Sequence, residues 1–244
     1  MNSTLHPDQL VFGIHPVVEL LKAKRRSVFS IYTTKPRPKG WSVVEPLIGV
    51  RSVQVKYVTR DVLTRMAGTT EHQGIVAIAQ PFKFRTNCFT ADKSPFVIVL
   101  DSIQDPRNLG AIIRSAYCTG ASGVVMIRKA SAPLSGVAFK ASAGLAEHTE
   151  IWLAPSTSAA MQALKSAGYT LYLAMLGGKN ATSVSYQGPV AVVIGNEEVG
   201  ISKNLTTYGT PIELPQRTTT ISYNASVAAG ILLFLIANQK KLIS

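Results

Sequence analysis

The first candidate functional residue in this sequence is an arginine on an otherwise apolar helix face. The stretch DSIQDPRNLGAIIRSAY, residues 101–117, predicts a loop entering a buried helix, in which Arg114 follows two isoleucines. A permanently charged guanidinium on such a face is costly unless it meets an anion. The residues alone leave three surroundings open: an anionic ligand, a carboxylate such as Glu197, or solvent reached at the sheet edge.

The loop GNEEVGIS, residues 195–202, is a second candidate, because it follows an apolar run. Its glycines and serine have the spacing of a phosphate-binding P-loop, but Ile201 occupies the lysine position. Two adjacent acids, Glu197 and Glu198, would also repel a triphosphate. The loop is therefore either a plain turn or a backbone cradle for a neutral or cationic ligand.

A third candidate lies before a long apolar helix, in ELPQRTTTISYNASVAAGILLF, residues 213–234. Either Ser222 or Asn224 can cap that helix by accepting hydrogen bonds from its free N–H groups, and the other would then face a ligand. Small residues at the start of the helix allow another helix to approach closely, in the core or at a dimer interface. They are Ala225, Ser226, Ala228, Ala229 and Gly230.

These segments need a scaffold, and the pattern around them predicts a parallel α/β sheet. Apolar runs alternate with helical patterns, as in doubly wound folds that bind ligands beyond the carboxyl ends of strands. The expected strands are 96–100, 123–127, 169–175, 190–195 and a short one near 211–215. A smaller α/β pattern precedes them, with a helix at 11–26 and strands at 30–34, 53–58 and 74–80. The polar, aperiodic residues 81–95 read as a linker.

The net charge of the chain also differs on the two sides of residue 95. Of the formal net charge of +12 over 244 residues, +8 falls in residues 1–95, which suggests a polyanion-binding module. Two cysteines and four histidines without ligand spacing predict no metal site. The longest apolar run, 227–237, is too short to span a bilayer, so we expect a cytoplasmic protein.

Taken together, the three segments resemble the SpoU-type (TrmH-like) ribose methyltransferases of the SPOUT superfamily. The first family motif is matched by Asn108, Gly110 and Arg114, and the second by Gly195, Glu197 and Gly200. The third is matched by Ser222-Tyr223-Asn224-Ala225-Ser226, and the similarity covers residues 96–244. The amino-terminal part is similar to the L30e-like substrate-binding domain of the family's rRNA members, through VFGIHPVVELLK and EHQGIVAIAQ.

The resemblance implies an α/β fold with two domains and a linker. An L30e-like RNA substrate-binding domain would occupy 1–80, a linker 81–95, and a SPOUT domain with a parallel sheet and a deep trefoil knot 96–244. The cofactor would be S-adenosyl-L-methionine (AdoMet), and the protein would be a homodimer paired through the carboxyl-terminal domain. The implied catalytic residues are Asn108, Arg114, Glu197, Ser222 and Asn224, and the implied cofactor-binding residues are Gly195, Gly200, Leu214 and Tyr223.

Because arginine stays protonated in proteins, we expect Arg114 to fix a phosphate and stabilise the developing 2′-alkoxide rather than act as a base. The favoured substrate is a guanosine of the 23S rRNA peptidyl-transferase P-loop. A tRNA guanosine substrate or a non-catalytic rRNA-binding protein remains the alternative. The RNA would be held by Lys22, Lys24, Arg25, Arg26, Lys35, Arg37 and Lys39.

Four residues depart from the family pattern. Tyr223 and Ala225 replace a leucine and a valine of the third motif. Gln216 and Arg217 stand where a smaller, more apolar Met-x-Gly run is usual. We expect these departures to alter the cofactor pocket.

Overall fold

The computed structural model describes residues 6–49, 53–129, 131–196, 199–218 and 220–243. It divides into two compact units, Met1–Lys83 with Pro133–His148 and Phe84–Ala132 with Thr149–Ser244. The expected domain limits of 80 and 95 remain a prediction, and the contact division adds residues 133–148 to the first unit. Within the expected linker, Phe89 is fully buried in the second unit.

The first unit is a four-stranded sheet with the order β1-β4-β2-β3, in which only β2 and β3 are parallel. Its strands are β1 (Leu10–Phe12), β2 (Val28–Thr33), β3 (Gln54–Tyr57) and β4 (Ile75–Ala79). Its helices are α1 (Ile14–Ala23), α2 (Trp41–Ile48), α3 (Arg60–Ala67) and α5 (Gly136–Ala141), followed by the short 3₁₀ helix η2 (Leu145–His148).

The helix expected at 11–26 is shorter than predicted, because strand β1 occupies its first residues. Gly13, with φ +95°, ends β1 and precedes the first residue of α1. Lys24 adopts a left-handed conformation that ends the helix. The expected apolar face is confirmed, since Val17 and Leu20 are fully buried.

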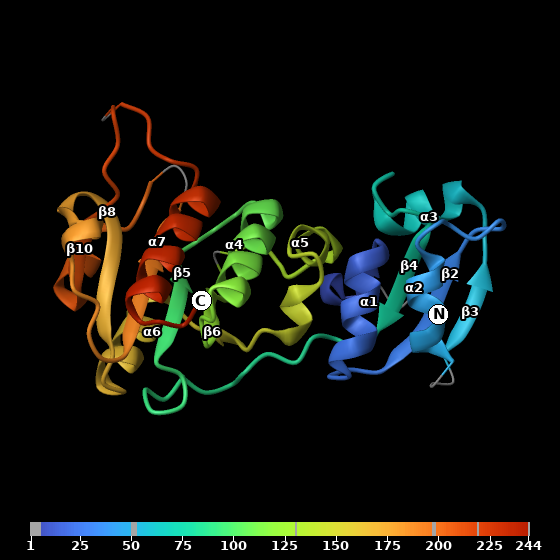
Figure 1. The fold of residues 1–244 in the computed structure, drawn as a ribbon, viewed down its shortest axis with the longest axis horizontal. Coiled ribbons are helices and arrows are strands. Elements are labelled where there is room, and N and C mark those ends of the chain that lie inside the picture. The colour runs from blue at the N-terminus through green and yellow to red at the C-terminus, as the bar shows by residue number, and fades with distance from the viewer. Residues whose placement is uncertain (1–5, 50–52, 130, 197–198, 219, 244) are drawn as a thin grey trace. The chain divides into compact units, whose positions relative to one another are not determined.

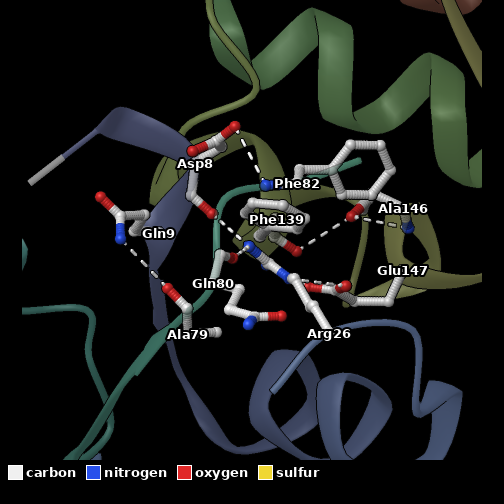
Figure 2. Close-up of polar contacts among 10 residues, drawn as sticks. Asp8, Gln9, Arg26, Ala79, Gln80, Phe82, Phe139, Ala146 and Glu147 are labelled. Atoms are coloured by element: carbon white, nitrogen blue, oxygen red, sulfur yellow. Dashed lines mark hydrogen bonds and ion pairs between the residues drawn. The ribbon is translucent and has the colours of Figure 1, made fainter. Parts of the chain in front are cut away.

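Arg26 is buried in the first unit, so the prediction that it contacts RNA is wrong. Its guanidinium pairs with the Glu147 carboxylate of η2, through Nε to Oε2 at 3.1 Å and through Nη2 to Oε1 (Figure 2). Nη1 also donates to the carbonyl oxygens of Asp8 at 2.5 Å and Gln80 at 2.9 Å. Residues 121 positions apart are thereby joined in one core.

The second unit is the expected parallel sheet, with six strands in the order β10-β8-β9-β5-β6-β7. The strands are β5 (Phe96–Leu100), β6 (Gly123–Ile127), β7 (Ile151–Ala154), β8 (Thr170–Asn180), β9 (Val190–Ile194) and β10 (Thr210–Glu213). We expected no strand at β7 and a shorter β8. The pairing of β10 with β8 shifts register after Pro211, so β8 continues past a bulge to reach Asn180.

Helices cover both faces of this sheet. In Figure 1, α4 (Pro106–Cys118) and α7 (Ala225–Gln239) lie side by side, and they contact each other. The α6 helix (Thr157–Ser166) packs with Val97 and Val99 of β5, so the alternate residues of that strand face the α4 and α7 side. The trefoil knot remains a prediction. No helix in the described parts of the chain is long and apolar enough to cross a membrane.

Candidate active site

A cavity of about 960 Å³ opens in the second unit where the central strands end. Residues just beyond β5 and β9 line it, together with parts of β8, β10 and the first turn of α7. This is the position that the parallel-sheet pattern predicts for a ligand, and the volume suits a nucleotide-sized molecule.

Five of the nine expected catalytic and cofactor-binding residues line this cavity: Gly195, Gly200, Leu214, Ser222 and Tyr223. They come from two loops separated along the chain by β10. The structure therefore brings all four expected cofactor-binding residues and one expected catalytic residue to the same wall.

The glycine loop after β9 is a tight turn whose glycines are sterically required. A Cβ added to Gly195 would lie 2.4 Å from the carbonyl carbon of Gly200 and 2.5 Å from the nitrogen of Ile201, which no side chain tolerates. Gly200 has φ +66°, a left-handed conformation that favours glycine. Glu197 and Glu198 lie outside the described residues.

Asn196 ties this loop to the loop after β5. Its Nδ2 donates to the carbonyl oxygen of Ser102 at 2.8 Å, and its Oδ1 accepts from the Val199 N–H at 3.2 Å. Ser102 has φ +64°, an uncommon conformation for a residue other than glycine. The two loops at the cavity floor are therefore held together at a strained point.

The helix that carries the first motif begins earlier than expected. Asp105 caps α4 by accepting from the Arg107 N–H at 2.8 Å, so the helix begins at Pro106, two residues before the expected start at Asn108. Arg114 is exposed and forms no ion pair with any described residue, so of the three surroundings left open by the sequence the structure shows solvent. A pair with Glu197 is not tested, because that residue is not described.

In the third motif, the structure shows which of Ser222 and Asn224 caps the last helix. The Asn224 Oδ1 caps α7 by accepting from the Ser226 and Val227 N–H groups at 2.9 and 3.4 Å. Ser222 is exposed and lines the cavity. Asn108, Arg114 and Asn224 are not part of the cavity wall in this chain.

Sequence reasoning missed Asp101, a buried carboxylate in the wall at the end of β5. Its Oδ1 accepts hydrogen bonds from the Thr157 hydroxyl at 2.5 Å and the Ser102 hydroxyl at 3.2 Å. An acid directly after the buried run FVIVL was the signal that could have identified it. Gln216, which we noted only as a departure from the family, also lines the cavity.

On the first unit, six of the seven basic residues expected to meet RNA are exposed, all but Arg26. Two of them lie next to Tyr57, a residue that is 39% exposed. The Lys35 Nζ lies 4.5 Å from the ring centroid, and Arg37 donates to the Tyr57 hydroxyl from Nε at 3.0 Å and Nη2 at 2.7 Å. This bond to Tyr57 and the ion pair with Glu45 raise the pKa of Arg37. The arrangement places an exposed ring among positive charges.

Comparison with known proteins finds two family matches along the chain. Residues 95–234 match the SpoU rRNA Methylase family, and residues 10–85 match an RNA 2′-O ribose methyltransferase substrate-binding domain. An uncharacterized tRNA/rRNA methyltransferase of Mycolicibacterium smegmatis is 32% identical over 96% of this chain and 77% of its own length. The 23S rRNA (guanosine-2′-O-)-methyltransferase RlmB of Shewanella oneidensis is 29% identical over 95% of this chain and 98% of its own length.

Among solved structures, the SpoU methyltransferase AviRb from Streptomyces viridochromogenes in complex with AdoMet superposes with a TM-score of 0.79. The match covers 95% of this chain and 90% of that one at 22% identity, which is a likeness of fold.

Proposed function

The chain belongs to the SpoU rRNA Methylase family, and from this premise we propose that it transfers a methyl group from AdoMet to the ribose 2′-hydroxyl of an RNA nucleotide. The observation that carries the proposal is that Gly195, Gly200, Leu214, Ser222 and Tyr223 line one and the same cavity. Two of the three family motifs thereby contribute to one wall beyond the ends of the central strands. The proposed substrate, ribosomal or transfer RNA, also agrees with the cytoplasmic location that we expect.

The residues of the cavity fit this cofactor. Gly195 lets the loop close on its own backbone, and Gly200 faces open space, where a ligand can approach the backbone closely. The buried Asp101 carboxylate suits a ligand with positive charge, and the sulfonium and ammonium groups of AdoMet both carry one. When bound, AdoMet supplies an electrophilic methyl group.

The chain's own residues would orient the attacking ribose. We assign Arg114 to a phosphate beside the target nucleotide and to the negative charge that develops on the 2′-oxygen. Its exposure and the absence of an ion-pair partner among the described residues leave the guanidinium available for that contact. Ser222, Asn108 and the Nδ2 of Asn224 would hold ribose and phosphate. We retain Glu197 as the residue that orients Arg114 or its loop.

The first unit would bind the RNA through its exposed basic residues. The Tyr57 ring offers a stacking surface for an unpaired base, while Lys35 and Arg37 offer contacts to phosphates. The match of residues 10–85 to a substrate-binding domain supports this role. Similarity to the S. oneidensis rRNA enzyme along 98% of that protein favours a guanosine in 23S rRNA over tRNA.

An exposed apolar strip on α7 supports a homodimer formed through the second unit. Val227, Ile231 and Phe234 are 48%, 37% and 54% exposed, and Tyr117 of the neighbouring α4 is 45% exposed. Large apolar side chains grouped in this way are typical of a protein interface. Because Arg114 is also exposed on α4, pairing through these helices would bring a second chain close to it.

The test is methyl transfer from labelled AdoMet to unmodified 23S rRNA and, in parallel, unmodified tRNA, followed by mass spectrometry of the nucleosides. We expect 2′-O-methylguanosine in rRNA alone. Product in tRNA alone would mean that the substrate is tRNA rather than rRNA and that the proposed reaction is correct. Absence of both product and AdoMet binding would favour the non-catalytic RNA-binding alternative.

A further inference from the structure

The carboxylate of Asp101, in the cavity wall, has one oxygen that receives no hydrogen bond from the described chain. The residue is 8% exposed, and its Oδ1 accepts from the Thr157 and Ser102 hydroxyls at 2.5 and 3.2 Å. Both of these bonds go to Oδ1, and no described residue donates to Oδ2. Buried polar atoms in folded proteins are nearly always paired, so Oδ2 calls for a donor from outside the described chain.

The Oδ2 atom is also accessible. Among the described residues, the side-chain nitrogens and oxygens that are fully buried without a hydrogen bond are Trp41 Nε1, Arg85 Nε and Gln216 Nε2. Asp101 Oδ2 is not one of them, so it keeps accessible surface although its residue is buried. Asp101, Ser102 and Thr157 all line the cavity, and we therefore place this surface in the polar corner that the three residues form.

Three elements fix the position of this carboxylate. Asp101 directly follows β5, and its N–H donates to the carbonyl oxygen of Ile194, the last residue of β9, at 2.8 Å. Thr157 is the buried first residue of α6, so its hydroxyl holds Oδ1 from the start of that helix. Lys203 also lines the cavity but forms no ion pair with Asp101, so this lysine does not neutralise the carboxylate. A carboxylate held through one oxygen presents the other in a fixed direction.

The chemistry of the vacant oxygen selects one of the two positive groups of AdoMet. An ionised carboxylate only accepts hydrogen bonds, and its strongest bonds are with charged N–H donors. The ammonium group has three such donors, whereas the sulfonium has three carbon substituents and cannot donate. A carboxylate against the sulfonium would also stabilise the charge that methyl transfer removes, which favours the bound cofactor over the transition state. The ammonium keeps its charge throughout the reaction.

We propose that Asp101 binds the ammonium group in the methionine moiety of AdoMet through its Oδ2. The inference rests on the proposed function, because it takes AdoMet as the ligand of this cavity. It deepens that function by assigning the methionine end of the cofactor to the corner formed by Asp101, Ser102 and Thr157. Asp101 is a binding residue and takes no part in methyl transfer.

The test is Asp101→Asn, which keeps the size of the side chain and removes its charge. The matched control is Asp92→Asn in the same unit, because Asp92 is exposed and lies outside the cavity. Calorimetry measures the affinity of each protein for three ligands. They are AdoMet, S-adenosylhomocysteine, and the deamino analogue of S-adenosylhomocysteine, in which a hydrogen atom replaces the amino group.

We expect the wild type to bind S-adenosylhomocysteine about 10- to 100-fold more tightly than the deamino analogue, the range of a hydrogen bond between charged groups. Asp101→Asn should weaken binding of S-adenosylhomocysteine and of AdoMet by a similar factor. The affinity of the variant for the deamino analogue should not fall, so its preference for the amino group is lost. Asp92→Asn should change none of these affinities.

Several results would overturn the inference. An equal loss of affinity for S-adenosylhomocysteine and its deamino analogue in Asp101→Asn would indicate a structural role. Loss of AdoMet affinity with S-adenosylhomocysteine affinity retained would place the carboxylate at the sulfonium instead. The wild type alone also decides, should the variant not fold, because equal affinity for S-adenosylhomocysteine and the deamino analogue would contradict an ammonium contact. A wild-type protein that binds none of the three ligands would overturn the proposed function, and this inference with it.

Discussion

Replacing Glu147 by Gln should destabilise the first unit while leaving the second unchanged. The Glu147 and Arg26 side chains are 1% and 3% exposed, so the substitution leaves a guanidinium buried without its counter-charge. The glutamine keeps the size of the side chain and one hydrogen-bond acceptor. The effect therefore isolates the charge rather than the packing.

The expected magnitude follows from the partners that remain. Breaking a buried ion pair by removing one charge costs about 3–5 kcal/mol. Arg26 keeps the carbonyl oxygens of Asp8 and Gln80 and the Phe139 ring, whose centroid is 4.8 Å from its guanidinium carbon. We therefore expect the low end, a loss of about 3 kcal/mol in the free energy of unfolding of this unit.

Each unit contains one of the chain's two tryptophans, which provides the assay. Trp41 lies in the first unit and Trp152 in the second, and both are buried. In a Trp152→Phe background, urea unfolding followed by fluorescence reports the first unit through Trp41. In a Trp41→Phe background it reports the second. Glu147→Gln should move only the Trp41 transition.

A double-mutant cycle separates the ion pair from its surroundings. Arg26→Met alone should cost about 3–5 kcal/mol, because it also removes the donor to the buried carbonyl oxygen of Asp8 and the partly buried one of Gln80. Because burial raises the pKa of the Glu147 carboxyl, against the opposing effect of Arg26, the lone acid can respond by protonating. Combining Arg26→Met with Glu147→Leu should cost clearly less than the two single changes together.

Two results would refute this reasoning. One is a shift of less than about 1 kcal/mol in the Trp41 transition, the range of an exposed pair. The other is an equal shift of the Trp152 transition, which would mean that the pair is not confined to the first unit. The exposed pair between Lys22 and Glu19 provides the control, since Lys22→Ala should have little effect on either transition.

The remaining predictions concern the site, the RNA surface and pH. Arg114→Ala should abolish methyl transfer while calorimetry finds AdoMet affinity unchanged, and retained turnover would contradict its assignment. Gly195→Ala should abolish AdoMet binding, because its Cβ would lie 2.4 Å from backbone; Gly230→Ala, whose Cβ meets Ser115 Oγ at an ordinary 3.6 Å, should not. Tyr57→Ala should raise the KM for RNA about 10-fold with kcat intact, whereas Tyr57→Phe keeps the ring and should have a smaller effect; equal effects would argue against stacking. Burial and Arg60 lower the pKa of His72, so the first unit should keep full stability above about pH 6.5 and lose it as pH falls through the lower folded-state pKa. A pH series of Trp41 unfolding checks this, and a flat profile between pH 7 and 5 would contradict it.

Local patterns in the sequence were enough for five of the six strands of the parallel sheet and for two of the loops that line the cavity. Apolar runs such as FVIVL and VAVVI identify buried strands because every one of their residues must be covered on both faces. The glycines of the loop after β9 could be identified because their backbone conformation and close approach are properties of that loop. The cap of α7 was narrowed to Ser222 or Asn224 by residue type alone.

The features that could not be predicted depend on contacts between residues that are distant in the sequence. Strand β1 has three residues and exists because β4, more than 60 positions later, pairs with it. The burial of Arg26 depends on Glu147, and the cavity depends on two loops that β10 separates along the chain. Local sequence determined which segments could form strands, helices and a glycine loop, because those choices depend on neighbouring residues. Only the tertiary structure decided which charge is buried and which loops line one cavity, because both depend on partners brought together by folding.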